Sequence, residues 1–249
     1  YDYAQRRNDQ VLPITIANSA YNTQLDTSLN LQRWLDYRAG AMIKPHIHCR
    51  VCGSEHLRKY IDLGLMPLAN SLDYSSQSAR TKERFPLQVM FCKDCYLSQL
   101  SVVIDPRAMF SNYTYRSGIN QGYITHCRRM AEELQERYHL TEYSLHIDIA
   151  GNDGTLLKQF KKAIGLRTLN IDPAANLVAI AESEGIESLV DFWSVPLAEQ
   201  IVQTHGKADL ITATNVFAHV DNVAEFIIAA SRLLKPDGLL VLEFPYLVD

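Results

Sequence analysis

The stretch "LHIDIAGNDGTLL", residues 145–157, decides how this chain folds, because it combines an apolar strand, a glycine-containing turn and the start of a helix. Gly151 and Gly154 allow the backbone of the turn to pass close to a ligand. Asn152 or Asp153 can cap the helix that follows, and the start of that helix can face a carboxylate or another anionic group. The stretch therefore predicts a ligand-binding turn within an α/β fold.

The same alternation continues toward the C-terminus. Strands are predicted at about 144–150, 167–172, 186–190, 208–213 and 238–244, with helices at about 153–163, 174–184, 195–204 and 221–234. Nearly continuous apolar strands separated by helices indicate a parallel sheet covered on both faces. Ligands of such sheets bind at the carboxyl ends of the strands, so we expect the functional residues there.

The segment before this alternation contains one further helix. Residues 121–138 place apolar side chains at intervals of three and four, which predicts one apolar helix face made of Tyr123, Cys127, Met130, Ala131, Leu134 and Tyr138. Cys127 is expected to be a packed thiol on this face. Residues 1–45 show no clear period and are interpreted as a linker or N-terminal extension, in which Asn30–Gly40 could form a short helix.

Four of the five cysteines form two C-x-x-C pairs: Cys49, Cys52, Cys92 and Cys95. A two-residue gap lets both sulfur atoms of a pair face one tetrahedral zinc ion, about 2.3 Å from each. Two such pairs would close the coordination sphere and make the zinc structural. The alternatives are a redox motif, two disulfides, or a site in which His46 or His48 replaces one cysteine.

Composition limits the classes of function. The chain has 249 residues, 47% hydrophobic and 21% charged, with a formal net charge of −4, which is typical of a globular protein without a basic nucleic-acid surface. Its apolar runs are too short to span a bilayer, and no charged-then-apolar leader is visible, so membrane association is not expected. The cytoplasm, where thiols stay reduced, is the expected location.

Polar residues follow the ends of several predicted strands. Asp172 closes the second strand, where an acid can accept hydrogen bonds from both hydroxyls of a ribose. The turn and this acid suit either a dinucleotide or S-adenosylmethionine. However, the turn reads A-G-N-D-G and lacks the G-x-G-x-x-G fingerprint of pyrophosphate binding, which favours S-adenosylmethionine.

Two further pairs support a cofactor site. Asp191 and Phe192 follow the third strand and could bind the amino group and ring face of an adenine, although an ordinary strand end would look the same. Asn215 and His219 follow the fourth strand, over the expected position of group transfer. The alternative for His219 is a histidine satisfied at the start of a helix.

In order along the chain from Cys49, the segments "CRVCGS", "IDLGLMPLAN", "FPLQVMFCKDCYLSQL", "MFSNYTYRSG", "IDIAGNDGTLL", "DFW", "NVFAHVDN" and "LLKPDGLLVLEFPYLVD" resemble the sugar C-methyltransferase family. Members methylate nucleotide-linked keto-deoxysugars, as in C-3 methylation, in antibiotic and surface-polysaccharide pathways. The resemblance implies a Rossmann-like class I methyltransferase sheet with a small N-terminal zinc-binding domain. It divides the chain into a zinc-binding domain (46–105), an aromatic lid loop with a connecting helix (106–140) and an S-adenosylmethionine-binding domain (141–249).

The resemblance also implies residue roles. The paired cysteines would hold structural zinc, and the cofactor would contact Tyr113, Ser117, Asp148, Ala150, Gly151, Asn152, Asp153, Gly154, Asp172, Asp191, Phe192 and Asn215. Tyr115 and His219 would be catalytic. A carbon beside a ketone attacks a sulfonium methyl only after a base removes its proton and the enolate charge is stabilised. The Tyr115 hydroxyl could donate to that enolate oxygen, the alternative being a packing aromatic.

The sequence departs from the family pattern in two places. Ala150 stands where the family usually has the first glycine of its turn. The segment that carries the family's general base, and the last two strands of the sheet, would follow "EFPYLVD". We therefore expect that the chain continues, that a partner completes the sheet, or that this is an inactive methyltransferase-like module of a larger assembly. Methylation of another small molecule is a further alternative.

Overall fold

The structure is a computed structural model that describes residues 43–72 and 75–245. The short helix predicted at Asn30–Gly40, and the whole of the extension up to residue 42, lie outside the described residues. Where the structure describes the chain, no helix is long and apolar enough to cross a membrane.

A five-stranded parallel sheet forms the larger part of the described fold. Its strands are β6 (Leu145–Ile149), β7 (Arg167–Ile171), β8 (Ser188–Leu189), β9 (Ala208–Thr214) and β10 (Leu234–Glu243). Their order is β10-β9-β6-β7-β8, and every neighbouring pair is parallel. This confirms the predicted α/β fold. The strand order reverses beside β6, which places the ligand crevice of such a sheet at the carboxyl ends of β6 and β9.

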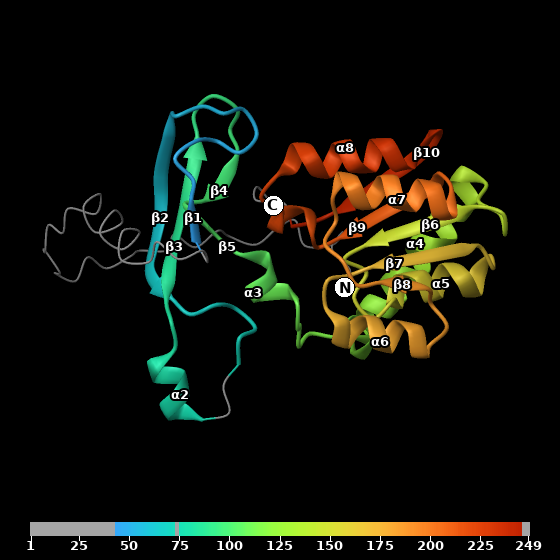
Figure 1. Ribbon diagram of the computed structural model, residues 1–249, viewed down its shortest axis with the longest axis horizontal. Helices are drawn as coiled ribbons and strands as arrows, with labels where there is room; N and C mark the ends of the chain where they lie inside the picture. The colour runs from blue at the N-terminus through green and yellow to red at the C-terminus, as the bar shows by residue number, and fades with distance from the viewer. Residues whose placement is uncertain (1–42, 73–74, 246–249) are drawn as a thin grey trace, which may run out of the picture. The chain divides into compact units, whose positions relative to one another are not determined.

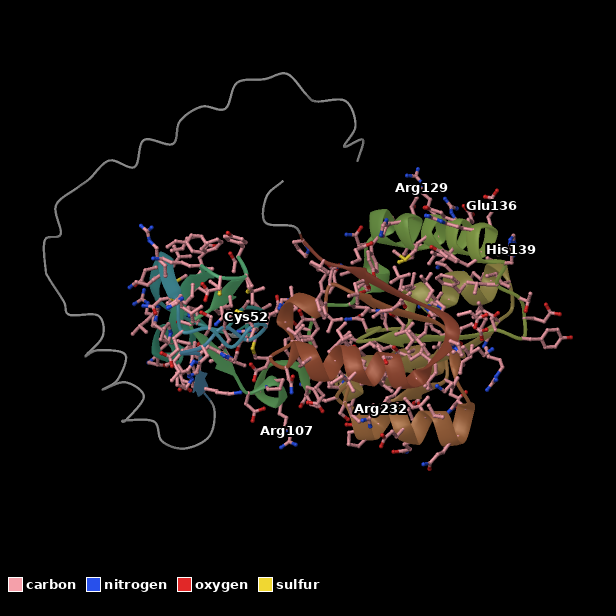
Figure 2. All side chains as sticks on the ribbon, turned by 90° about the horizontal axis from the view of Figure 1, so that it is seen from above. Cys52, Arg107, Arg129, Glu136, His139 and Arg232 are labelled. Atoms are coloured by element: carbon pink, nitrogen blue, oxygen red, sulfur yellow. The ribbon has the colours of Figure 1, made fainter. Side chains whose placement is uncertain are left out.

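Helices cover both faces of the sheet, as predicted. They are α4 (Gln121–Tyr138), α5 (Thr155–Ala163), α6 (Ala175–Ser183), α7 (Val195–His205) and α8 (Val223–Leu233). Arg129 and Glu136 of α4 lie on the opposite side of the sheet from Arg232 of α8 (Figure 2). One core cluster joins the strands to α7 and α8, and a second packs α4 against α5 around the fully buried Phe160. Burying one such large apolar side chain contributes about 1.5–3 kcal/mol.

The predicted apolar face of α4 is largely confirmed. Cys127 and Ala131 are buried, and Tyr123, Met130 and Leu134 pack against the same cluster. Tyr138 was expected on this face but is 42% exposed, so that part of the prediction is wrong. The helix ends at this residue, because the following His139 adopts a left-handed conformation with φ 52°.

The cysteine-bearing region, as we name residues 43–72 and 75–104, contains short antiparallel elements. These are β1 (Ile43–Pro45), β2 (Leu57–Met66), α2 (Ser76–Thr81), β3 (Phe85–Cys92), β4 (Ser98–Leu100) and β5 (Val102–Ile104). They form a β2-β3-β4 sheet and a β1-β5 pair (Figure 1). Most of β2 is exposed, so this region has little apolar core of its own.

Three short helical elements precede α4 or follow β9 in the chain. They are α3 (Pro106–Phe110), η1 (Ser117–Ile119) and η2 (Phe217–His219). At the other side of the parallel sheet, β10 has β9 as its only partner among the described strands. In the part of the chain that the structure describes, the far side of β10 is therefore unpaired, as expected for a sheet without its last two strands.

Candidate active site and metal centre

The turn after β6, residues 150–154, has an unusual backbone. Ala150, Asn152 and Gly154 have φ angles of 56°, 58° and 69°, in the left-handed region that favours glycine. A Cβ on Gly151 would overlap Asn170 Oδ1 and lie 2.7 Å from Asp148 Oδ2. The buried side chains of Asn170 and Asp148 therefore lie directly against the backbone of this residue, and only glycine fits at this position.

The predicted side-chain cap of α5 is wrong. Gly154, which has a left-handed backbone, occupies the N-cap without a side-chain hydrogen bond, and the helix starts at Thr155, two residues after Asp153. Asp153 is fully buried, and its Oδ1 accepts the hydroxyl of Thr155 at 2.5 Å instead of a backbone N–H. Asn152 directs its side chain toward residues 115 and 117.

A buried polar chain crosses the central strands beneath this turn. Thr212 donates to Asp148 at 2.7 Å, and the Thr212 oxygen lies 2.8 Å from Nε2 of His146. Burial lowers the pKa of His146 to about 3, so the ring is neutral and its Nε2–H can donate to Thr212. Burial, with a smaller effect of the charge on Asp172, raises the pKa of Asp148 to about 7.

Asp172 lies directly after β7, as predicted, and faces the turn. Its Oδ2 accepts the backbone N–H of Asn152 at 2.9 Å, and its Oδ1 accepts that of Ala174 at 2.8 Å. Burial raises its pKa, and these two N–H groups oppose the shift. A carboxylate has more than two acceptor positions, so the side chain can still receive ligand hydroxyls. The acid and the turn are thus joined by a direct hydrogen bond.

The aromatic loop, residues 113–118, contacts both this turn and α6. The backbone of Tyr113 bonds to the side chain of Asn176, and the Tyr113 hydroxyl accepts from Asn70 at 2.9 Å. Ser117 donates its backbone N–H to Asn152 Oδ1 at 3.0 Å. The Tyr115 side chain is 45% exposed. The structure therefore brings the loop to the turn that the sequence predicts to bind the cofactor.

The other predicted site residues follow β8 and β9, the third and fourth strands of the parallel sheet along the chain. Asp191 is exposed and accepts the N–H of Phe192, which is partly buried. Asn215 has a left-handed backbone, φ 56°, and its N–H donates to the Glu243 carbonyl at 2.7 Å. The His219 ring lies 6.2 Å from the Phe110 ring. Contact of these residues with a ligand stays a prediction.

Several residues around this site were not singled out in the sequence. Asn176 and Asn70 hold the aromatic loop, while Thr212 and His146 form the buried chain under Asp148. Their partners lie 43 to 66 residues away, so local spacing carries no signal for these contacts. For Thr212, the position near the end of a predicted strand is a signal that could have identified it as a neighbour of the site.

The four paired cysteines converge on one point. Their sulfur atoms all lie within 4.8 Å of one another, with 3.4 Å between Cys49 and Cys95 and 3.6 Å between Cys52 and Cys92. Four sulfurs placed about 2.3 Å from a tetrahedral zinc ion are about 3.8 Å apart, so the cluster fits zinc. The N–H groups of Cys95 and Asp94, opposed by burial, lower the pKa of Cys92, whereas hydrogen bonding among the clustered sulfurs contributes to the raised pKa of Cys52 and Cys95.

Both cysteine pairs lie on matching turns. Cys49 N–H donates to the Ser54 carbonyl and Cys92 N–H to that of Leu97, at 2.8 and 2.9 Å. The histidines considered as alternative ligands are not part of this cluster: His46 Nε2 lies 2.7 Å from Asp221, and the exposed His48 lies 3.7 Å from Glu55. In the described residues the candidate metal ligands are thus the four cysteines. Cys127 is buried on α4, as predicted.

The strand order, the turn after β6 and the acid after β7 together define a class I S-adenosylmethionine-dependent methyltransferase fold, with a cysteine site that fits zinc. Comparison with known proteins agrees. A family model described as "Methyltransferase domain" matches residues 123–248, and one described as "Putative zinc binding domain" matches residues 49–110. The chain belongs to the methyltransferase domain family, with S-adenosylmethionine as its cofactor and a zinc-binding domain in addition.

Individual relatives are similar in parts. The chain is 34% identical over 208 residues to the C-methyltransferase NovU of Streptomyces niveus, covering 84% of this chain and 49% of NovU. It is 31% identical over 90 residues to a ubiquinone biosynthesis O-methyltransferase of Bordetella pertussis, covering 35% and 37%. The chain therefore spans about half or less of the length of these curated relatives.

Matches among solved structures include Streptomyces venezuelae DesVI, with a TM-score of 0.42, 18% identity and coverage of 52% of this chain and 53% of DesVI. Another is the plantazolicin methyltransferase BpumL in complex with a pentazolic desmethylPZN analog and SAH. Its TM-score is 0.40, with 15% identity and coverage of 48% and 45%.

Proposed function

We propose that this chain takes part in S-adenosylmethionine-dependent C-methylation of a nucleotide-linked keto-deoxysugar or a similar small molecule. The observation that carries the proposal is the hydrogen bond from Asn152 N–H to Asp172 Oδ2, 2.9 Å long. It joins the turn after β6 to the acid that can hold a ribose, so both parts of a nucleoside site are prepared in one place. Similarity to the C-methyltransferase NovU supports the choice of carbon as the acceptor.

The proposed roles follow the positions of the residues. The turn 148–154 and Asp172 would hold the methionine and ribose ends of the cofactor, Asp191 and Phe192 the adenine, and Tyr113, Ser117 and Asn215 the remaining surface. Bound S-adenosylmethionine supplies an electrophilic methyl group. Tyr115 would donate a hydrogen bond to an enolate oxygen, and His219 would contact the acceptor.

We also propose the wider organisation. The zinc-binding domain would comprise residues 46–105, the lid loop and connecting helix 106–140, and the cofactor domain 141–249. Because the chain spans about half of NovU, the general base and the strands that cover β10 would come from a further segment or a partner. The cytoplasm, whose reduced thiols suit a cysteine-held zinc ion, is the proposed location.

Calorimetry with S-adenosylhomocysteine tests the cofactor site. Asp172→Ala should weaken binding by about 1–3 kcal/mol, because a charged acceptor of two ribose hydroxyls is lost. Asp209→Ala is the matched control. Asp209 also accepts a backbone N–H, that of Leu145 at 2.8 Å, but it lies at the amino end of β9, away from the turn.

Three outcomes separate the alternatives. Weaker binding by the Asp172 variant alone supports the proposal. Equal affinity for both variants and the wild type would remove Asp172 from the site. No binding by the wild type at millimolar ligand would identify the chain as an inactive methyltransferase-like module with a zinc site.

A further inference from the structure

The side chain of Asn176 makes two hydrogen bonds to the backbone of one residue in the aromatic loop. Its Oδ1 accepts the N–H of Tyr113 at 3.2 Å, and its Nδ2 donates to the carbonyl of Tyr113 at 2.8 Å. Asn176 is the second residue of α6, and the loop approaches this helix after leaving α3 (Figure 1). The amide therefore pairs with the loop as a neighbouring strand would, using both of its polar atoms.

Asn152 repeats this arrangement two residues further along the loop. Its Nδ2 donates to the carbonyl of Tyr115 at 3.1 Å, and its Oδ1 accepts the N–H of Ser117 at 3.0 Å. The backbone N–H of the same residue donates to Asp172. One residue thus connects the acid, the turn after β6 and the loop.

A buried carboxylate fastens the end of the loop. Asp153 Oδ2 accepts the N–H of Gly118 at 3.0 Å and Nε of Arg116 at 2.8 Å. Burial alone would raise the pKa of Asp153, but hydrogen bonds from Thr155 and Arg116 hold it below its usual value, so the anchor stays charged. A Cβ on Gly118 would lie 2.6 Å from Asp153 Oδ2, so this close approach requires glycine.

Tyr115 lies between these anchors. Its backbone carbonyl accepts from Asn152, and its side chain is 45% exposed. Tyr113, two residues before it, is bonded to Asn176, and Arg116, directly after it, is bonded to Asp153. We propose that Asn176 is a positioning residue that, together with Asn152, holds the aromatic loop against the turn after β6 and thereby sets the place of Tyr115. That Tyr115 acts in catalysis at this position rests on the proposed function.

Hydrogen exchange of the loop amides tests Asn176 directly, with the full chain. Asn176→Asp keeps the acceptor for Tyr113 N–H but turns a carboxylate oxygen toward the Tyr113 carbonyl, so the two oxygens repel. Asn176→Ala removes both bonds without repulsion. If Asn176 only stabilised the start of α6, the Asn176→Asp variant should be at least as stable as Asn176→Ala, because a negative charge at a helix start interacts favourably with the helix dipole.

We expect the opposite order in the loop. The hydrogen-exchange rate of the segment 113–118 should rise several-fold in Asn176→Ala and about tenfold or more in Asn176→Asp. The melting temperature of the Asn176→Asp variant should be no lower than that of Asn176→Ala. Asn222→Asp is the control, because it adds the same charge at the start of α8 and should leave loop exchange unchanged. The inference would be overturned if loop exchange were unchanged in both Asn176 variants. It would also be overturned if loop exchange increased only in proportion to the loss of overall stability, so that the less stable variant always exchanged faster.

S-adenosylhomocysteine separates this inference from the proposed function. In the wild type, bound ligand should slow exchange of the segment 113–118 further, and Asn176→Asp should lose most of that added protection. If the wild type binds no ligand, the proposed cofactor site fails, yet the exchange order of the free proteins still decides whether Asn176 anchors the loop.

Discussion

In the parallel sheet all five residues of β6 are buried, whereas most of β2 in the cysteine-bearing region is exposed. The sheet is enclosed by two layers of helices and held by apolar packing. The cysteine-bearing region instead brings its four cysteines together at one end of the β2–β3 pair, two before the start of β2 and two at or just after the end of β3. We therefore expect that the parallel-sheet region folds on its own core, whereas the cysteine-bearing region needs a metal ion to fold.

Removal of zinc should have the largest effect. Binding of structural zinc supplies about 10–16 kcal/mol in zinc-finger peptides, far more than the small core of this region can replace. Cys92→Ser, or treatment with a strong chelator, should abolish hydrogen-exchange protection in β2 and β3 and leave β6 and β9 protected. Metal analysis should give about one zinc per wild-type chain and none in Cys92→Ser.

The matching controls act on the other region. Cys127→Ala should retain zinc, because this buried thiol is packed on α4. Phe160→Ala should lower the free energy of unfolding of the parallel-sheet domain by about 3–5 kcal/mol and leave the zinc content unchanged. Loss of protection in both regions after either treatment would contradict independent stabilisation.

The second prediction concerns the polar groups inside the apolar core. The pKa of Asp148 is raised to about 7, so the folded protein keeps a proton that the unfolded chain releases near pH 4. Its contribution to stability is complete below about pH 4 and is lost as the pH rises through about 7. Asp148→Asn stays neutral and can still accept from Thr212, so it should not show this loss.

Urea unfolding between pH 4 and 8 measures the difference. The variant should become more stable than the wild type as the pH rises, by on the order of 4 kcal/mol at pH 8, because one pKa unit corresponds to about 1.4 kcal/mol. The contribution of His146 is common to both proteins and cancels. Parallel stability curves would show that Asp148 is not the group responsible.

The strands were predictable from their regular alternation with helical patterns. In the structure β6, β7 and β9 are buried along nearly their whole length, although each also contains polar residues. The helix after β6 starts two residues later than predicted, since Gly154 adopts a left-handed backbone. The helices α2 and α3, six and five residues long, are too short to show a period.

The site was predictable only where it follows strand ends. Asp172 could be located because an acid directly follows a predicted strand. Asn176 could not, because its partner is a backbone group 63 residues away and any residue could occupy that backbone position. Side chains that bind main-chain atoms across long separations leave no pattern in a single sequence.

The smallest expected effect is at Ala150, whose φ of 56° is unfavourable for a residue with a Cβ. Ala150→Gly should relieve this strain and raise the free energy of unfolding by up to about 1 kcal/mol, since greater freedom of the unfolded chain offsets part of the gain. Ala179→Gly, at an exposed position within α6, should instead destabilise by about 1 kcal/mol. Differential scanning calorimetry distinguishes the two signs.

The side of β10 that none of the described strands covers has a practical consequence for work with the purified chain. A row of free N–H and C=O groups on an edge strand is a template to which a strand of any other molecule can add. Concentrated samples should thus form reversible clusters whose mass increases with protein concentration. A short peptide that pairs with β10, or a charged residue introduced along it, would keep the preparation monodisperse.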